Sequence, residues 1–189
     1  MAPPSVWTIG HSNQSLAAFL ELLRGEAIDV LVDVRSHPYS RFAPHFGRGR
    51  LEPALRARGI EYRFLGRELG GRPALDEHYD EEGHALYGPM SGTNDFRDAV
   101  ASVLAEASAH RVALMCSEAD PQGCHRRLLV GRILTERGAE LRHILRDGAV
   151  SVEREVPVEA GEAWRSPQPV AQRARPGVRP GSRGSPASR

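Results

Sequence analysis

Five short apolar runs recur along the chain, and segments of mixed polarity separate them. Valine, isoleucine and leucine are frequent in these runs, which is typical of strands that are buried on both faces of a sheet. We expect strands at residues 6–10, 29–34, 60–66, 111–116 and 140–145.

The segments between the runs place apolar residues three or four positions apart, which is the spacing of a helix face. In the first such segment, Ser15 opens the helix and Gly25 suits its C-terminal cap. Further helices are expected at 51–59, 96–107 and about 121–137, and a glycine-rich connection covers about 67–92.

Strands that alternate with helices predict an α/β fold, in which a mostly parallel sheet of about five strands lies between two helical layers. Right-handed crossovers would connect the strands. In such sheets, ligands bind beyond the carboxyl ends of the strands. The residues that follow each run are therefore the first candidates for a functional site.

Composition changes this picture mainly at the C-terminal end. The chain has 189 residues, 40% of them hydrophobic, and all of its 25 basic residues are arginine. Five arginines and no acid lie in residues 166–189, which are rich in proline, serine and glycine. We expect one domain over 1–165, where the other 20 arginines face 24 acids, and a disordered tail over 166–189. The tail could be a solvated extension without function or a weak tether to nucleic acid.

Location and partners are only coarsely constrained. No run approaches the roughly 20 apolar residues of a membrane span, and the N-terminus lacks the basic and apolar regions of a signal peptide. With two cysteines and no visible export signal, we expect a cytoplasmic protein with reduced thiols and no membrane partner. The oligomeric state stays open.

Polar or small residues follow the first two predicted strands: Gly10, His11, Ser12 and Arg35. Asp33 lies inside the second apolar run and needs a buried partner, so a purely structural ion pair is an alternative to ligand binding. We expect His11, Arg35 and Cys124 to line one cleft, with the first strand beside the fourth.

The densest chemistry lies at residues 115–127, MCSEADPQGCHRR. Asp-Pro at 120–121 is a helix-start signal, which would place Cys124, His125 and Arg126 in or near the first helical turn. Free N–H groups, the helix dipole and the guanidinium would favour an anion there and a thiolate at Cys124. Alternatively, Cys124 is an inert thiol under the helix, and Arg126 pairs with Glu118 or with the aspartate at 120.

Cys116 ends the preceding strand and is either a buried structural thiol or a second reactive one that approaches Cys124. Structural zinc sites usually take four cysteine or histidine ligands, often with two cysteines two to four residues apart. Seven residues separate the cysteines here, so we predict no metal and no cofactor, although His11 and His125 could complete a site if the fold allowed it. Phosphatase and rhodanese loops place five residues between cysteine and arginine, which does not match, and no dinucleotide fingerprint or P-loop is present.

Two connections add further candidates. Residues 36–50 interleave basic and imidazole side chains with aromatic ones, which can grip phosphates and stack bases. Arg41 is the ligand-binding candidate in this loop, and a lid packed by its aromatic rings is the alternative. Gly70 and Gly71 suit close approach of the backbone to a ligand or a simple turn. The acidic stretch at 76–84 is expected to be a surface loop.

Four ordered motifs resemble the family called domain of unknown function 488: TIGHS at 8–12, DVR at 33–35, FLGRELGGRP at 64–73 and CSE…CHRRLL at 116–129. The resemblance covers about residues 6–146 and implies a small α/β domain with a Rossmann-like sheet. It implies these signature positions: Gly10, His11, Asp33, Arg35, Gly70, Gly71, Cys116, Glu118, Cys124, His125 and Arg126. It does not imply an established reaction.

Two functions from different classes fit these features. The first is a thiol- or histidine-dependent hydrolase or transferase acting on an anionic, phosphorylated or nucleotide-like small molecule. Its catalytic residues would be Cys116, Cys124, His11 and His125. Its ligand-binding residues would be Gly10, Ser12, Asp33, Arg35, Arg41, Gly70, Gly71, Glu118 and Arg126. The second is a non-catalytic nucleic-acid-binding module that uses the 36–50 loop and the basic tail.

Overall fold

Among the residues that the structure describes, a six-stranded sheet forms the centre of the fold. The computed structural model describes residues 3–156 and 164–170. The strands are β1 (Ser5–Gly10), β2 (Val30–Asp33), β3 (Glu61–Phe64), β4 (Val112–Cys116), β5 (Glu140–Ile144) and β6 (Val150–Glu153). They lie in the order β3-β2-β4-β1-β5-β6, and all neighbours are parallel except β5 and β6. The predicted α/β fold with a mostly parallel sheet is confirmed.

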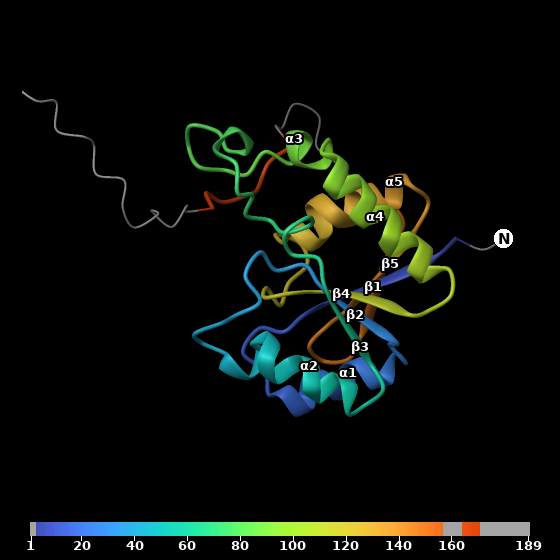
Figure 1. Cartoon of the computed structure of the whole chain (residues 1–189). Helices are drawn as coiled ribbons and strands as arrows, with labels where there is room; N and C mark the ends of the chain where they lie inside the picture. The colour runs from blue at the N-terminus through green and yellow to red at the C-terminus, as the bar shows by residue number, and fades with distance from the viewer. Residues whose placement is uncertain (1–2, 157–163, 171–189) are drawn as a thin grey trace, which may run out of the picture.

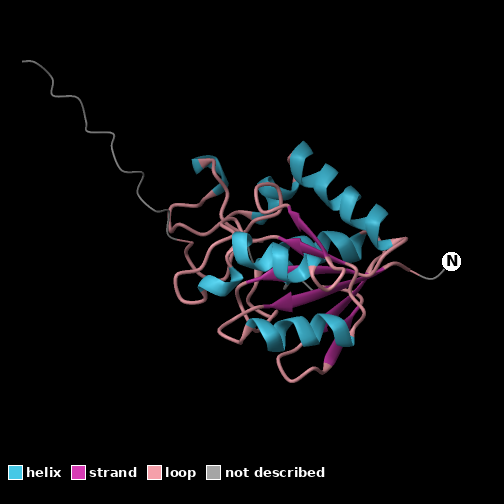
Figure 2. Ribbon diagram, turned by 60° about the horizontal axis from the view of Figure 1, so that its bottom comes forward, coloured by secondary structure: helices cyan, strands magenta, loops and turns pink. Residues whose placement is uncertain are grey.

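Helices cover both faces of the sheet, which makes three layers (Figures 1 and 2). On one face lie α1 (Leu16–Gly25) and α2 (Arg48–Arg56), and on the other lie α4 (Asn94–Ala107) and α5 (Arg132–Glu136). The shorter helices are η1 (Pro44–Phe46), η2 (Asp76–His78), α3 (Tyr87–Ser91) and the π-helical η3 (Arg126–Gly131).

The strands divide the core into two hydrophobic clusters because successive side chains point to opposite faces of the sheet. Leu31 of β2 packs with Phe19 of α1 on one side. The next residue, Val32, belongs to the cluster that contains Phe96 of α4 on the other side. Ser15 caps α1 as predicted, with its Oγ accepting a hydrogen bond from Ala18 N at 3.2 Å.

The sixth strand was not expected from the apolar pattern. β6 lies at the edge of the sheet and is only partly buried, so it lacks the continuous apolar run of a central strand. An Asp147-Gly148 turn joins it to β5, with Gly148 at a φ of 85°. Asp-Gly between two strands is a hairpin signal that could have revealed this strand.

The helix after β4 begins later than predicted. Asp120 Oδ1 accepts a hydrogen bond from Gln122 N at 2.9 Å and so starts a turn rather than the helix. Cys124 N then donates to Pro121 O at 3.1 Å, and helical backbone starts at His125. The fold therefore places Cys124 immediately before the helix, with Arg126 beginning η3.

The packed chain continues past the predicted boundary at residue 165. Ser166 is buried and exchanges hydrogen bonds with the backbone of Ala85, while Val170 N donates to Gly83 O at 2.7 Å. Residues 164–170 thus satisfy backbone groups of the 83–87 segment, which a disordered tail could not do. The rest of the predicted tail, 171–189, lies outside the described residues. Within the described ranges, no helix is long and apolar enough to cross a membrane.

Candidate functional site

The carboxyl ends of the parallel strands open into a cavity of about 610 Å³. The helices that follow β1 and β4, which are neighbours in the sheet, cover opposite faces, so this edge is a topological switch point where α/β proteins bind ligands. Cys116, at the end of β4, lies on the cavity wall together with residues from three loops and from 166–170.

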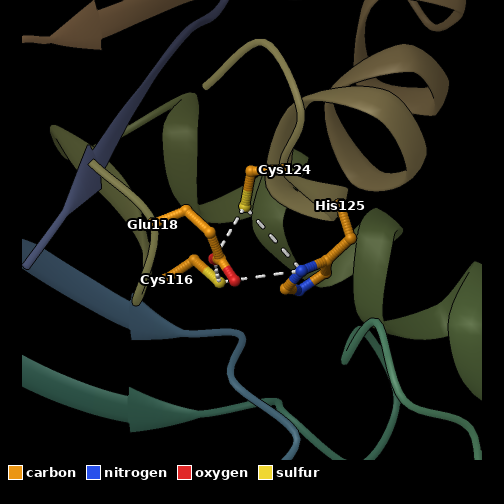
Figure 3. Close-up of side chains that lie close together, drawn as sticks. All are labelled: Cys116, Glu118, Cys124 and His125. Atoms are coloured by element: carbon orange, nitrogen blue, oxygen red, sulfur yellow. Dashed lines mark hydrogen bonds between the residues drawn. The ribbon is translucent and has the colours of Figure 1, made fainter. Parts of the chain in front are cut away.

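Four side chains with metal-binding or nucleophilic atoms converge on this wall (Figure 3). Cys116 Sγ donates to Glu118 Oε2 at 2.7 Å, and Cys124 Sγ donates to the same oxygen at 3.2 Å. His125 Nδ1 lies 3.6 Å from the first sulfur and 3.8 Å from the second. One ligand atom from each of the four residues falls within 4.8 Å of the other three. We call these four residues the Cys-Glu-His cluster.

The imidazole of His125 is oriented by its far nitrogen. Nε2 lies 3.0 Å from Val34 O, and because a carbonyl can only accept, Nε2 carries a proton and Nδ1 faces the sulfurs. Gly71 packs against the ring, since a Cβ at this position would lie 2.6 Å from His125 Cγ. Position 71 therefore requires a glycine because the backbone packs closely on the His125 ring.

Arg126 fixes the loop that carries Glu118. Its guanidinium is buried and donates to Glu118 O at 2.6 Å and to Ala119 O at 3.0 Å. On the other side of that loop, a Cβ on Gly10 would lie only 1.7 Å from Glu118 O. Arg126, predicted as an anion clamp, is not among the residues that line the cavity, and its contacts point to a positioning role instead.

The cluster favours negative charge. Burial alone would raise the pKa of Glu118, but hydrogen bonds from both thiols help to lower it to about 2. Burial also raises the pKa of Cys116 well above its ordinary value. Burial acts on Cys124 in the same direction, but the hydrogen bond with Cys116 and the charges of the two following side chains lower its pKa. Both thiols donate to the Glu118 carboxylate in this structure, and Cys124 is the more readily deprotonated of the two.

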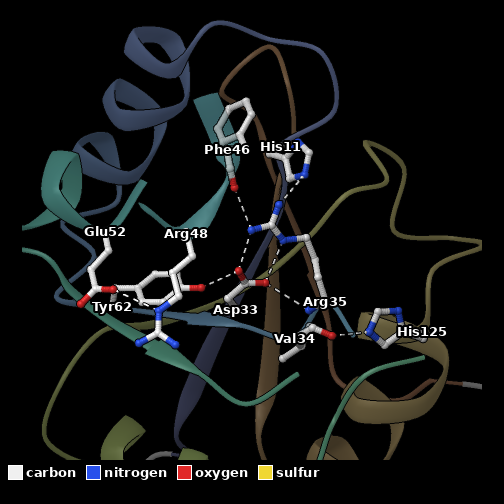
Figure 4. A network of polar contacts seen from close by, with 9 residues as sticks. All are labelled: His11, Asp33, Val34, Arg35, Phe46, Arg48, Glu52, Tyr62 and His125. Carbon is white, nitrogen blue, oxygen red and sulfur yellow. Dashed lines mark hydrogen bonds and ion pairs between the residues drawn. The ribbon is translucent and has the colours of Figure 1, made fainter. Parts of the chain in front are cut away.

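Asp33, Arg35 and His11 form a separate buried network (Figure 4). Arg35 donates to Asp33 at 2.9 and 2.6 Å and to Phe46 O at 2.9 Å, and Asp33 also accepts from Tyr62 Oη at 2.7 Å. The ion pair satisfies the buried carboxylate, in line with the structural alternative for Asp33. Arg35 also lines the cavity, although its donors are largely occupied.

His11 lies behind this network rather than on the cavity wall. Its Nε2 is 3.1 Å from Arg35 Nη1, and its ring stacks on Phe46 with centroids 4.4 Å apart. Burial lowers the pKa of His11 to about 4. The expected convergence therefore holds for Arg35 and Cys124, which share the cavity, and β1 does lie beside β4. His11 reaches the cavity only through Arg35.

The remaining candidates have mixed placements. Ser12 donates its N–H to Ser117 O at 2.9 Å and does not line the cavity. Arg41 is exposed, with its guanidinium 5.7 Å from the ring centroid of Phe42, and also lies outside the cavity wall. Gly70 packs on Ser36, where a Cβ would lie 2.4 Å from Oγ.

Sequence reasoning missed Arg72 and residues 166–170, which line the cavity. Arg72 directly follows Gly71, and both residues line the cavity. The two glycines, which suit close approach of the backbone to a ligand, could therefore have pointed to Arg72 as their neighbour. His37 and Tyr39 of the 36–50 loop line the cavity as well.

The donor set of the cluster suits a transition-metal ion. Two cysteine sulfurs, one imidazole nitrogen and one carboxylate oxygen match the ligands that bind zinc at tetrahedral sites. Histidines that bind metals usually donate their other ring N–H to a carbonyl or carboxylate, as His125 does to Val34 O. The seven-residue spacing does not keep the cysteines apart, because the 117–123 loop folds back and brings both thiols to Glu118.

Comparison with known proteins identifies the family but no reaction. No curated protein and no solved structure gave a significant match to this sequence. One family model, described as Domain of unknown function DUF488, matches residues 15–133. The match is shorter than the resemblance seen in the motifs, but it includes the cluster, Arg35 and the paired glycines. The chain belongs to the DUF488 family.

Proposed function

We propose that the Cys-Glu-His cluster binds a divalent transition-metal ion, with zinc as the best fit, and that the ion binds a small anionic molecule in the adjoining cavity. The observation that carries this proposal is the convergence of four ligand atoms within 4.8 Å at the wall of a 610 Å³ cavity. Thiolate and imidazole ligands together favour zinc or a chemically similar ion over magnesium or calcium.

The four ligands are not equivalent. Cys116 and Cys124 are buried and His125 is held by Val34, whereas Glu118 is the most solvent-exposed of the four residues. Catalytic zinc sites use three protein ligands and leave a fourth position for water or substrate. We infer that the two cysteines and the histidine are the permanent ligands, and that Glu118 can leave the fourth position and act as a proton acceptor beside it.

The charge of the site supports metal binding before anion binding. The Glu118 carboxylate and the readily deprotonated Cys124 thiol would disfavour an anionic ligand at the cluster. A divalent ion reverses the sign of the local field, and Arg72 and His37 on the cavity wall add further positive or hydrogen-bonding groups. An ion held by Cys116, Cys124 and His125 would supply Lewis-acid chemistry there, and Glu118 beside it would accept a proton. The reaction class that fits best is hydrolysis or group transfer on an anionic small molecule.

A nucleic-acid-binding role has a specific observation in its favour. Phe42 is 91% exposed and Arg41 lies over its ring, a pairing that occurs in single-strand binding surfaces. This alternative predicts oligonucleotide affinity that falls steeply with salt and does not require the cluster. Cys124→Ser should leave such affinity unchanged, whereas it should abolish metal-dependent binding of a small anion.

Titration of the reduced full-length chain with Co²⁺ tests the metal proposal. We expect one ion per chain, with the intense near-ultraviolet absorption of cobalt–thiolate bonds. His125→Asn should weaken binding at least tenfold, whereas His110→Asn, a change at a half-exposed histidine on the surface, should have no effect. Absence of the thiolate band, or an equal loss in both variants, would contradict the proposal.

A further inference from the structure

The cavity is larger than a simple anion requires. Its volume of about 610 Å³ lies in the range of pockets that hold organic ligands and cofactors. An inorganic phosphate at the metal position would leave most of this space to water. This volume fits a ligand that has an anionic group at the cluster and a larger organic part that fills the rest of the cavity.

Arg72 and the cluster line the part of the cavity where an anionic group would bind. Because Gly71 packs directly on the His125 ring, the next residue, Arg72, is held close to the cluster. Its backbone N–H donates to Ser36 Oγ at 2.9 Å, which fixes the start of the side chain. None of the ion pairs found among the described residues involves Arg72. A guanidinium in this position suits a phosphate oxygen.

The cavity wall also carries an accessible aromatic ring. Tyr39 lines the cavity and is 66% exposed. Its N–H donates to His37 O at 2.8 Å, a tight turn that brings both residues to the cavity wall. Phe42, three residues further along the same loop, is even more exposed but does not line the cavity. An accessible ring on a cavity wall offers a face on which a planar group can stack.

We propose that Tyr39 forms a subsite for a planar aromatic ring, so that the ligand is a phosphorylated aromatic compound of nucleotide type. The phosphate lies between the metal ion and Arg72, and the ring stacks on Tyr39. This inference rests on the proposed function for the phosphate end, while the ring subsite rests on Tyr39 and the cavity. Sugar phosphates and other anions without an aromatic ring would use only the phosphate end of the site.

Calorimetric titration of the zinc-loaded full chain with AMP, ribose 5-phosphate and adenosine tests the subsite. Stacking of a base on an aromatic side chain is worth about 1–3 kcal/mol, so AMP should bind about 5- to 150-fold more tightly than ribose 5-phosphate. Tyr39→Ala should remove this difference without changing the affinity for ribose 5-phosphate. Phe42→Ala is the matched control on the same loop and should change neither affinity.

The outcomes separate the two proposals. Equal affinities for AMP and ribose 5-phosphate, or equal effects of the two loop variants, would overturn the ring subsite. Zinc bound at one ion per chain with no binding of any of the three probes would overturn it as well and leave the metal site standing. Failure to bind zinc would refute the proposed function, and the same comparison on the metal-free chain would then decide the ring subsite. Binding of oligonucleotides but not of AMP would also overturn it.

Discussion

Replacing Arg126 by alanine should destabilise the protein and the candidate site together. The side chain is 1% exposed, so its contacts are made away from water. It donates to Glu118 O and Ala119 O at 2.6 and 3.0 Å. The substitution removes both donors and leaves two carbonyls of the 117–123 loop without these partners.

The expected loss follows from these two hydrogen bonds. A hydrogen bond to a charged group contributes about 1.5–3 kcal/mol, so losing both should lower the free energy of unfolding by at least about 3 kcal/mol. For a protein of this size, each kcal/mol corresponds to roughly 2–4 °C in Tm. We therefore expect a fall of roughly 10 °C. Because this loop joins the two cysteine ligands, Cys116 and Cys124, the metal affinity should also fall, by about 10- to 100-fold as for other residues that position metal ligands.

Urea unfolding and scanning calorimetry of the metal-free protein measure the stability change, and a competitive zinc titration measures the affinity. Arg24→Ala is the control, because Arg24 pairs with Glu21 on the surface with 73% of its side chain exposed and should change stability by less than about 0.5 kcal/mol. If Arg126→Ala were as stable as this control, the positioning role would be refuted, and a free anion clamp would be the better description.

Three further changes test other parts of the structure. A chain that ends at Val170 should keep the Tm of the full protein, while one that ends at Trp164 should lose several degrees in calorimetry, since it lacks the hydrogen bonds to the 83–85 segment; equal values would show that this contact is unimportant. Burial lowers the pKa of His11 to about 4, so between pH 4 and the ordinary histidine pKa of about 6.5 the unfolded chain binds more protons than the folded one. The contribution of His11 to the free energy of unfolding should therefore be fully present above about pH 6.5 and fall by roughly 3 kcal/mol towards pH 4. Urea unfolding at several pH values measures this change, and a flat profile would contradict the expectation. Gly71→Ala places a Cβ 2.6 Å from the imidazole behind it and should weaken zinc binding in the same competitive titration, whereas Gly25→Ala, with open space around it, should not.

Apolar periodicity was sufficient to predict the central strands and the two helical layers. β1, β2, β4 and β5 are buried, so each had to be a short apolar run. The edge strand β6 escaped this reasoning because half-exposed strands do not need such a run. The helix after β4 was placed too early because an aspartate before a proline can also start a turn, as Asp120 does.

The sequence predicted which residues form the site better than it predicted their chemical roles. The strand-end rule correctly brought Cys116 and Cys124 to one edge of the sheet. Whether Arg126 points into a cavity or into the loop depends on its χ angles and on the packing around it, which no residue spacing encodes. Contacts of Gly10 and Arg126 with Glu118 O hold the loop between the cysteines in a folded-back conformation. This conformation brings together ligand atoms that lie far apart in the sequence.

The proposed metal site requires that both sulfurs of the cluster bind the ion. X-ray absorption spectroscopy on the zinc-loaded protein, with metal content measured by mass spectrometry, counts these sulfur neighbours. We expect one zinc per chain with two sulfur neighbours at about 2.3 Å and one or two nitrogen or oxygen neighbours at about 2.0–2.2 Å. Cys116→Ser and Cys124→Ser should each remove one sulfur neighbour. A zinc shell made only of nitrogen and oxygen, or a sulfur count unchanged by both substitutions, would contradict it.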